Sequence, residues 1–99
     1  MDLNKLMQQA QKMQNDLTKI EDELKTSVYE GTAAGNMVVV KMNGSHEVTE
    51  VSITEEAMED REMLQDLVLI AVNEAVTKAA EDRNSKMNSV TQGIKLPGM

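Results

Sequence analysis

The sequence contains no cysteine, no tryptophan and no phenylalanine, and it has one tyrosine and one proline. Without cysteine the chain can form no disulfide, no thiolate metal site and no cysteine nucleophile. With a single aromatic residue it also lacks the stacking surface on which proteins hold the bases of single-stranded nucleic acid. These absences exclude a disulfide-stabilised fold, a thiol enzyme and an aromatic single-strand binder.

Long apolar runs are absent as well, including from the N-terminal stretch "MDLNKLMQQAQ". We therefore expect no signal sequence, no membrane association and a cytoplasmic location. A chain of 99 residues is expected to form one domain. Because a domain this small buries only about two thirds of its unfolded surface, a second subunit is expected to add apolar burial.

The sequence contains few side chains that could act in catalysis. The single histidine, His46, follows an Asn43-Gly44 pair and has no second imidazole or thiol to work with. No glycine motif for nucleotide phosphates is present, and the acidic cluster around Glu55–Glu62 lacks the spacing of a calcium loop. The sequence therefore predicts a protein that is not an enzyme and needs no cofactor, with a solvated acidic surface.

The charge of the chain is unevenly distributed. The formal net charge is −7, and residues 47–66 hold eight acids against Arg61 alone, which already accounts for −7. The remaining residues carry nine bases and nine acids, and both ends of the chain lean positive. A negative protein repels phosphates at long range, so any contact with nucleic acid must come from a local group of cations.

The N-terminal segment has the pattern of an amphipathic helix. Its apolar residues recur at alternating spacings of three and four, as in the a and d positions of a heptad. They are Leu3, Leu6, Ala10, Met13, Leu17, Ile20 and Leu24. This seam predicts a helix over residues 3–24, about 35 Å long, that packs against one neighbouring helix.

A β-rich segment follows, with Val, Thr and Ile punctuated by glycines, and it predicts three short antiparallel strands. The Asn43-Gly44 pair is expected to take the positive φ angles of a tight hairpin turn. Both alternating sets of residues in "NMVVVKM" are largely apolar, which predicts a central strand covered on both faces. A partner chain is the expected second cover.

From Asp60 to about Met87 the apolar residues follow helical spacing on a wide stripe, which predicts a second long helix over the sheet. Thr54 and Asp60 are the expected N-caps. The predicted organisation is a single domain over 1–99. Its parts are a helical arm at 1–25, a three-stranded sheet at 26–54, helices at 55–88 and a flexible tail at 89–99. Because both helices are longer than so small a sheet, they are expected to project beyond it as arms.

A ridge of lysines on the N-terminal helix is the remaining feature of the sequence that indicates a binding surface. Lys5, Lys12 and Lys19 recur every seven residues, which places them about 10 Å apart along one helix face. Flanked by Gln8 and Asn15, this ridge could contact successive backbone phosphates of duplex DNA. An ordinary solvated helix face fits the same periodicity. The nine methionines likewise fit either core filling, which we favour, or an adaptable surface for a partner.

Four segments, in order, resemble the YbaB/EbfC family of bacterial nucleoid-associated proteins. They are "LMQQAQKMQ", "VVVKMNGSHEVTEVSI", "LQDLVLIAVNEAVTKA" and "KMNSVTQGIKLPGM". The resemblance implies an α-β-β-β-α chain of the α+β class that forms a homodimer with projecting helical arms. It also implies DNA binding through those arms. The family's contacts would fall here on Lys5, Lys12, Lys19, Lys78, Arg83 and Lys86.

The favoured interpretation is a homodimeric DNA-binding protein of the bacterial nucleoid that holds duplex DNA by its backbone, organises the nucleoid and regulates gene expression. The alternative is a non-enzymatic protein–protein interaction module, in which the same helical seams hold a protein partner and the lysines only solvate the surface.

Overall fold

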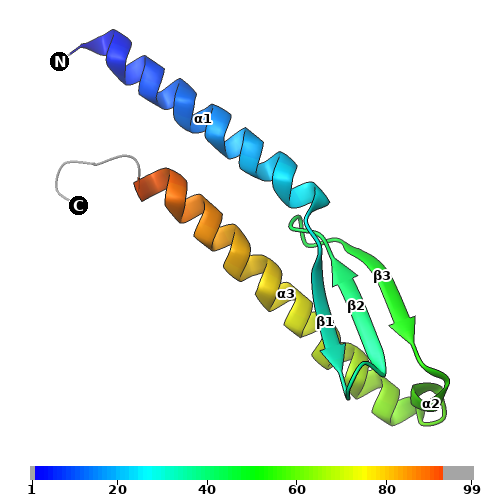
Figure 1. Ribbon diagram of the computed structural model, residues 1–99. Helices are drawn as coiled ribbons and strands as arrows, with labels where there is room; N and C mark the ends of the chain where they lie inside the picture. The colour runs from blue at the N-terminus through cyan, green and yellow to red at the C-terminus, as the bar shows by residue number, and fades with distance from the viewer. Residues whose placement is uncertain (1, 93–99) are drawn as a thin grey trace.

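The computed structural model describes residues 2–92 and consists of three helices and three strands within that range. In chain order these are α1 (Leu3–Thr26), β1 (Tyr29–Ala33), β2 (Val38–Met42), β3 (Val48–Ile53), α2 (Glu55–Met58) and α3 (Arg61–Gln92). The molecule is elongated, at 67 × 26 × 16 Å. The sheet lies toward one end, and α1 and α3 extend together toward the other (Figure 1). The predicted α+β class, the α-β-β-β-α order and the projecting helices are confirmed.

The three strands form an antiparallel sheet in the order β1-β2-β3, so β2 is central as predicted. Val38, Val40 and Met42 of β2 are buried on the face that α3 covers. On the other face Val39 lies between Thr32 and Ser52. Next to them Lys41 forms an ion pair with Glu50 at 3.2 Å. That face is polar, so the predicted covering of both faces of β2 is not found within residues 2–92.

Close packing of α3 on β1 depends on small residues. Ala71, Ala75 and Ala79 form a fully buried stripe on α3. A Cβ atom added to Gly31 of β1 would lie 1.9 Å from the carbonyl oxygen of Ala71. Only glycine fits at that distance, and its absence of a side chain lets the strand backbone lie directly on the helix.

The end of α1 is fixed to the sheet at one point, which we call the joint and define as Leu24 with Gly44. Leu24 is completely buried, and the amide of Gly44 donates a 2.7 Å hydrogen bond to its carbonyl oxygen. A Cβ atom at Gly44 would lie 2.6 Å from that of Leu24. In this turn the positive φ occurs at His46, at 62°, and not in the Asn43-Gly44 pair. Gly44 therefore serves close packing, and the predicted φ > 0 at this pair was wrong.

The helix ends follow local capping chemistry. The side chain of Thr54 accepts a hydrogen bond from the amide of Ala57, and that of Asp60 accepts one from the amide of Met63 at 3.1 Å, so both predicted N-caps are found. α3 continues to Gln92, four residues beyond the predicted end of the helices at 88, so the first four residues of the predicted tail are helical. The rest of that tail, 93–99, lies outside the described residues. No helix in the described range is both long and apolar enough to cross a membrane.

Candidate nucleic-acid interface

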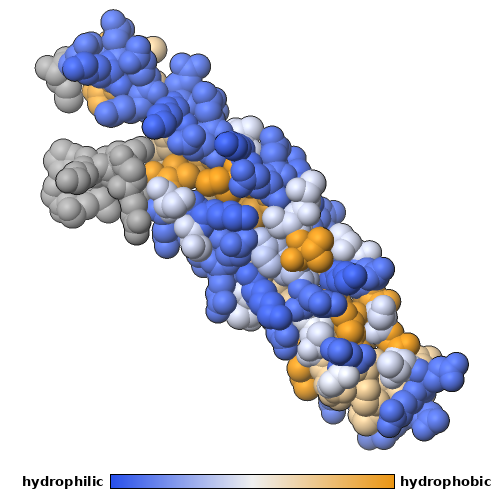
Figure 2. Space-filling model, viewed as in Figure 1, coloured by the Kyte–Doolittle hydropathy of each residue, from blue (hydrophilic) through white to orange (hydrophobic). Residues whose placement is uncertain are grey.

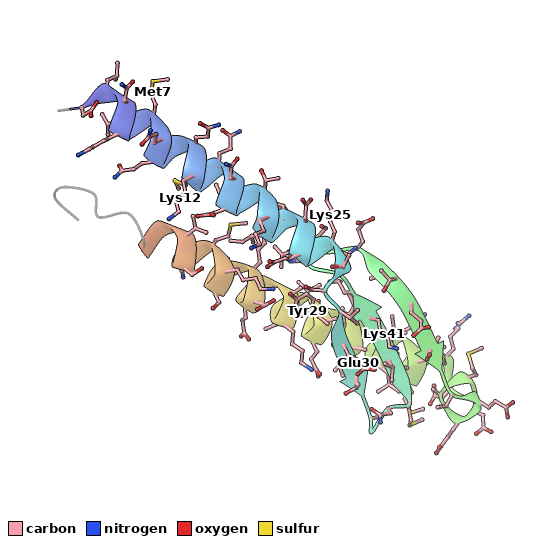
Figure 3. All side chains as sticks on the ribbon, turned by 45° about the horizontal axis from the view of Figure 1, so that its top comes forward. Met7, Lys12, Lys25, Tyr29, Glu30 and Lys41 are labelled. Carbon is pink, nitrogen blue, oxygen red and sulfur yellow. The ribbon has the colours of Figure 1, made fainter. Side chains whose placement is uncertain are left out.

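A groove of about 380 Å³ runs between α1 and the C-terminal turns of α3. It is lined by residues from both helices: Lys12, Asp16, Lys19, Ile20, Glu23, Ser89 and Val90. Figure 3 shows Lys12 pointing from α1 toward the end of α3. In the view of Figure 2, hydrophobic residues gather between the two helices, while the outward side of α1 is hydrophilic. The lysine ridge thus borders the space between the arms.

Three of the four lysines of α1 are available to a partner, whereas Lys25 is paired with Asp22. Lys5, Lys12 and Lys19 are exposed, and none forms an ion pair or hydrogen bond with another residue in the described range. Asp16 and Glu23 line the same groove as Lys12 and Lys19. The two acids offset the charge of these two lysines inside the groove. The side of the ridge that faces away from the groove is therefore the better surface for an anion.

Three of the four cations of α3, the predicted contacts Lys78, Arg83 and Lys86, form ion pairs within the described residues. Lys78 donates to the carbonyl oxygen of Glu30 at 2.8 Å and pairs with Glu74 at 3.1 Å. Arg83 lies 2.5 Å from Glu21 of α1. All of these residues lie near the base of the arms, so Lys78 ties α3 to β1 and Arg83 ties α3 to α1.

Lys86 belongs to a cluster that sequence reasoning missed. Its ammonium group lies 3.0 Å from Asp82, whose carboxylate also accepts a hydrogen bond from the hydroxyl of Tyr29. Desolvation and the bond to Asp82 raise the pKa of Tyr29, whereas the bonds from Tyr29 and Lys86 lower the pKa of Asp82. The bond to Asp82 raises the pKa of Lys86. This cluster joins the start of β1 to α3 just where the arms leave the sheet.

Most of the acids in residues 47–66 lie away from the lysine ridge. Six of the eight acids in residues 47–66 belong to α2, to the turn after it and to the first turns of α3: Glu55, Glu56, Glu59, Asp60, Glu62 and Asp66. This part of the chain forms the end of the molecule opposite the tips of α1 and α3 (Figure 1). Within the described residues no group of three or more His, Cys, Asp or Glu side chains could hold a metal ion.

The outer strand β3 carries an exposed apolar surface. Val51 and Ile53 pair with Val40 and Val38, so their side chains are on the face of the sheet that α3 covers. However, α3 packs across β1 and β2, and all six residues of β3 are exposed. Val48, Val51 and Ile53 are 47%, 50% and 40% exposed. We call these three residues the β3 face.

The chain thus has the architecture of a small α+β body with two long projecting helices, one of which bears three lysines that have no partner within residues 2–92. The same fold occurs in an uncharacterised protein from Helicobacter pylori, HP0035. Its crystal structure matches with a TM-score of 0.78 and 26% sequence identity, over 86% of this chain and 91% of that one.

The chain belongs to the YbaB/EbfC DNA-binding family, whose model matches residues 1–94. A nucleoid-associated protein of Chloroflexus aggregans is 43% identical over 96% of this chain and 97% of its own length. One from Ligilactobacillus salivarius is 44% identical over 100% and 95%. The family resemblance noted in the sequence is thereby confirmed, and the family is one of bacterial nucleoid-associated proteins.

Proposed function

We propose that this protein binds duplex DNA as a homodimer in the bacterial cytoplasm, where it organises the nucleoid and influences gene expression. The observation that supports this most directly is the row of exposed lysines on α1 that have no partner within the described chain. Membership of a DNA-binding family supplies the ligand class. The DNA is held mainly through its phosphates, because lysines on a helix surface provide charge without a base-reading geometry.

The spacing of the lysines fits a DNA backbone. Seven residues of helix correspond to about 10.5 Å, which is roughly three nucleotide steps of 3.4 Å along one strand. Lys5, Lys12 and Lys19 would therefore meet separate phosphates if α1 lay along the duplex. The acidic end of the molecule is far from this contact, which reduces the repulsion that the net charge of −7 would otherwise cause.

Lys78, Arg83 and Lys86 are proposed as secondary contributors. Each already forms an ion pair with a carboxylate on α1 or α3. An ammonium or guanidinium that shares its charge with a carboxylate attracts phosphate less strongly than an unpaired one. Their main part in DNA binding would be to hold the two arms in position.

The homodimer is proposed to form through the β3 face. Three exposed aliphatic side chains on one strand are costly to leave in water. In addition, Leu69 and Ile70 of α3 are 60% and 53% exposed. We expect the single substitution Val51→Lys to convert the dimer to a monomer with an intact fold, measured by sedimentation and circular dichroism. Ser52→Lys, on the opposite face of the same strand, is the matched control. If the Ser52→Lys variant were also monomeric, or if the Val51→Lys variant remained dimeric, this interface would be wrong.

The test of DNA binding is a salt titration on a duplex of mixed sequence. The six ridge lysines of a dimer, Lys5, Lys12 and Lys19 from each chain, predict a slope of log K against log[salt] of about −5. Replacing Lys5, Lys12 and Lys19 by alanine should abolish most of that slope and weaken binding at low salt. A matched control replaces Lys25, Lys41 and Arg61, which removes the same charge from elsewhere on the molecule. Equal losses in both variants would refute the ridge as the site, and salt-independent binding by the wild type would refute phosphate contact.

A further inference from the structure

The apolar seam of α1 is covered along only part of its length. Near the joint Leu24 is fully buried, and Leu17 and Ile20 are half-buried where α3 runs alongside. Toward the tip Leu6 is 43% exposed and Leu3 is 68% exposed. Because these residues continue one seam at a/d spacing, the exposed part is the direct extension of the face that α3 covers.

The described part of α3 ends where the seam becomes exposed. Ser89 and Val90 line the groove opposite Lys12 and Asp16 of α1. The two helices run in opposite directions, so α3 ends on the side of the molecule where the tip of α1 also lies (Figure 1). Seven residues remain after Gln92.

Length and composition of this last segment match the uncovered seam. From Lys12 to Leu3 the helix rises about 14 Å, while seven extended residues span up to about 23 Å. The segment reads "GIKLPGM", in which Ile94 and Leu96 alternate with a lysine. In an extended chain such i and i+2 side chains share one side. Pro97 disfavours helical backbone at the residue before it.

We propose that residues 93–99 dock on the first three turns of α1 in the same chain, with Ile94 and Leu96 covering the seam at Leu3, Leu6 and Ala10. The interaction is apolar and does not depend on DNA. Met7 lies outside the docking surface, because its side chain points away from the α3 side of the helix (Figure 3). Where the proposed DNA binding also holds, this docking places Lys95 on the outward side of the segment, beside the lysine ridge.

The absence of native cysteine makes the proposal directly testable by disulfide trapping in the full-length chain. In the double variant Leu6→Cys with Leu96→Cys, the two introduced thiols can form a disulfide only when their Cα atoms come within about 7 Å. Under mild oxidation we expect this pair to form an intramolecular disulfide that migrates as a single chain on non-reducing denaturing gels. The matched control pairs Leu96→Cys with Gln8→Cys, which is about 200° around the helix from Leu6 and should cross-link much less.

A second measurement leaves residues 2–92 unchanged. Deleting residues 93–99, or replacing Ile94 and Leu96 by aspartate, should speed hydrogen exchange at the amides of the first turns of α1 and leave β2 unaffected. The proposal is overturned if the Leu6→Cys and Gln8→Cys variants form a disulfide with Leu96→Cys equally well, or if the disulfide of the Leu6→Cys variant joins two chains. It is also overturned if neither tail variant alters hydrogen exchange in α1. None of these readouts uses DNA, so failure here leaves the proposed DNA binding unaffected.

Discussion

Gly31→Ala is predicted to be among the most damaging single-methyl changes in this protein. The added Cβ atom would lie 1.9 Å from the carbonyl oxygen of Ala71 and 2.7 Å from the amide nitrogen of Ala75. Ordinary van der Waals contact begins at 3.4 Å, so β1 and α3 would have to separate by about 1.5 Å. Neither atom can turn aside, because both belong to the helix backbone.

The cost follows from what the separation would uncover. The stripe of Ala71, Ala75 and Ala79 is fully buried against the sheet, and small side chains cannot reach across a widened gap. Overpacking of this kind costs about 1–3 kcal/mol or more. For a domain of this size each 1 kcal/mol lowers the melting temperature by roughly 4–8 °C. Because the clash is with backbone atoms, we expect the upper end of that range, about 3 kcal/mol, which corresponds to a drop of roughly 12–24 °C.

Two other glycines provide controls in the same assay, thermal unfolding followed by circular dichroism. Gly35 has φ +61° and nothing within 4 Å of its added Cβ, so Gly35→Ala should cost only the strain of a left-handed alanine, about 1 kcal/mol. Gly44→Ala meets the side chain of Leu24, which can partly adjust, and should fall between the two. If Gly31→Ala proved as mild as Gly35→Ala, the argument from close backbone approach would be wrong.

Further predictions concern the contacts at the base of the arms. Because the pKa of Tyr29 is raised above 10.0, its stabilising contribution is present below that pH and is lost as pH rises through the folded-state pKa. The stability advantage of the wild type over Tyr29→Phe should therefore disappear in alkaline denaturation curves. The pKa of Asp82 is lowered from 3.8, so its contribution is present above that pH and is lost on acidification; Asp82→Asn should flatten the acid limb of the stability curve. A double-mutant cycle of Glu21→Gln with Arg83→Met should give a coupling free energy of about 0.2–1 kcal/mol, because both side chains are about one third exposed. A coupling of zero would show that their ion pair does not stabilise the fold.

Much of the fold could be predicted from the sequence because it depends on local patterns. The a/d spacing of α1, the alternation in β2 and the capping residues Thr54 and Asp60 each fix a nearby backbone conformation. The polar outer face of the sheet could not be predicted from β2 alone. Val39 is apolar, but its neighbours on that face are Thr32 and Ser52, which only the strand register brings beside it.

The positions of the candidate site residues could be predicted from the sequence, but only some of their ion pairs could be. The lysine ridge follows from helical periodicity, and the structure leaves those lysines exposed. The ion pair of Arg83 with Glu21 joins residues 62 positions apart, so no local pattern reveals it. In contrast, the pairs of Lys78 with Glu74 and Lys86 with Asp82 are four residues apart on α3, and this spacing was a readable signal that those cations are engaged.

The angle at which α1 leaves the joint of Leu24 and Gly44 determines where the tip of the helix lies. From Leu24 to Leu3 the helix measures about 32 Å, so a rotation of only about 5° at the joint moves the tip by roughly 3 Å. That displacement is close to the 3.4 Å rise per nucleotide on one DNA strand. In the proposed DNA complex, a change of a few degrees at the joint would therefore displace the tip of α1 by nearly one nucleotide step. The packing of Leu24 on Gly44 would then determine which phosphate Lys5 can reach.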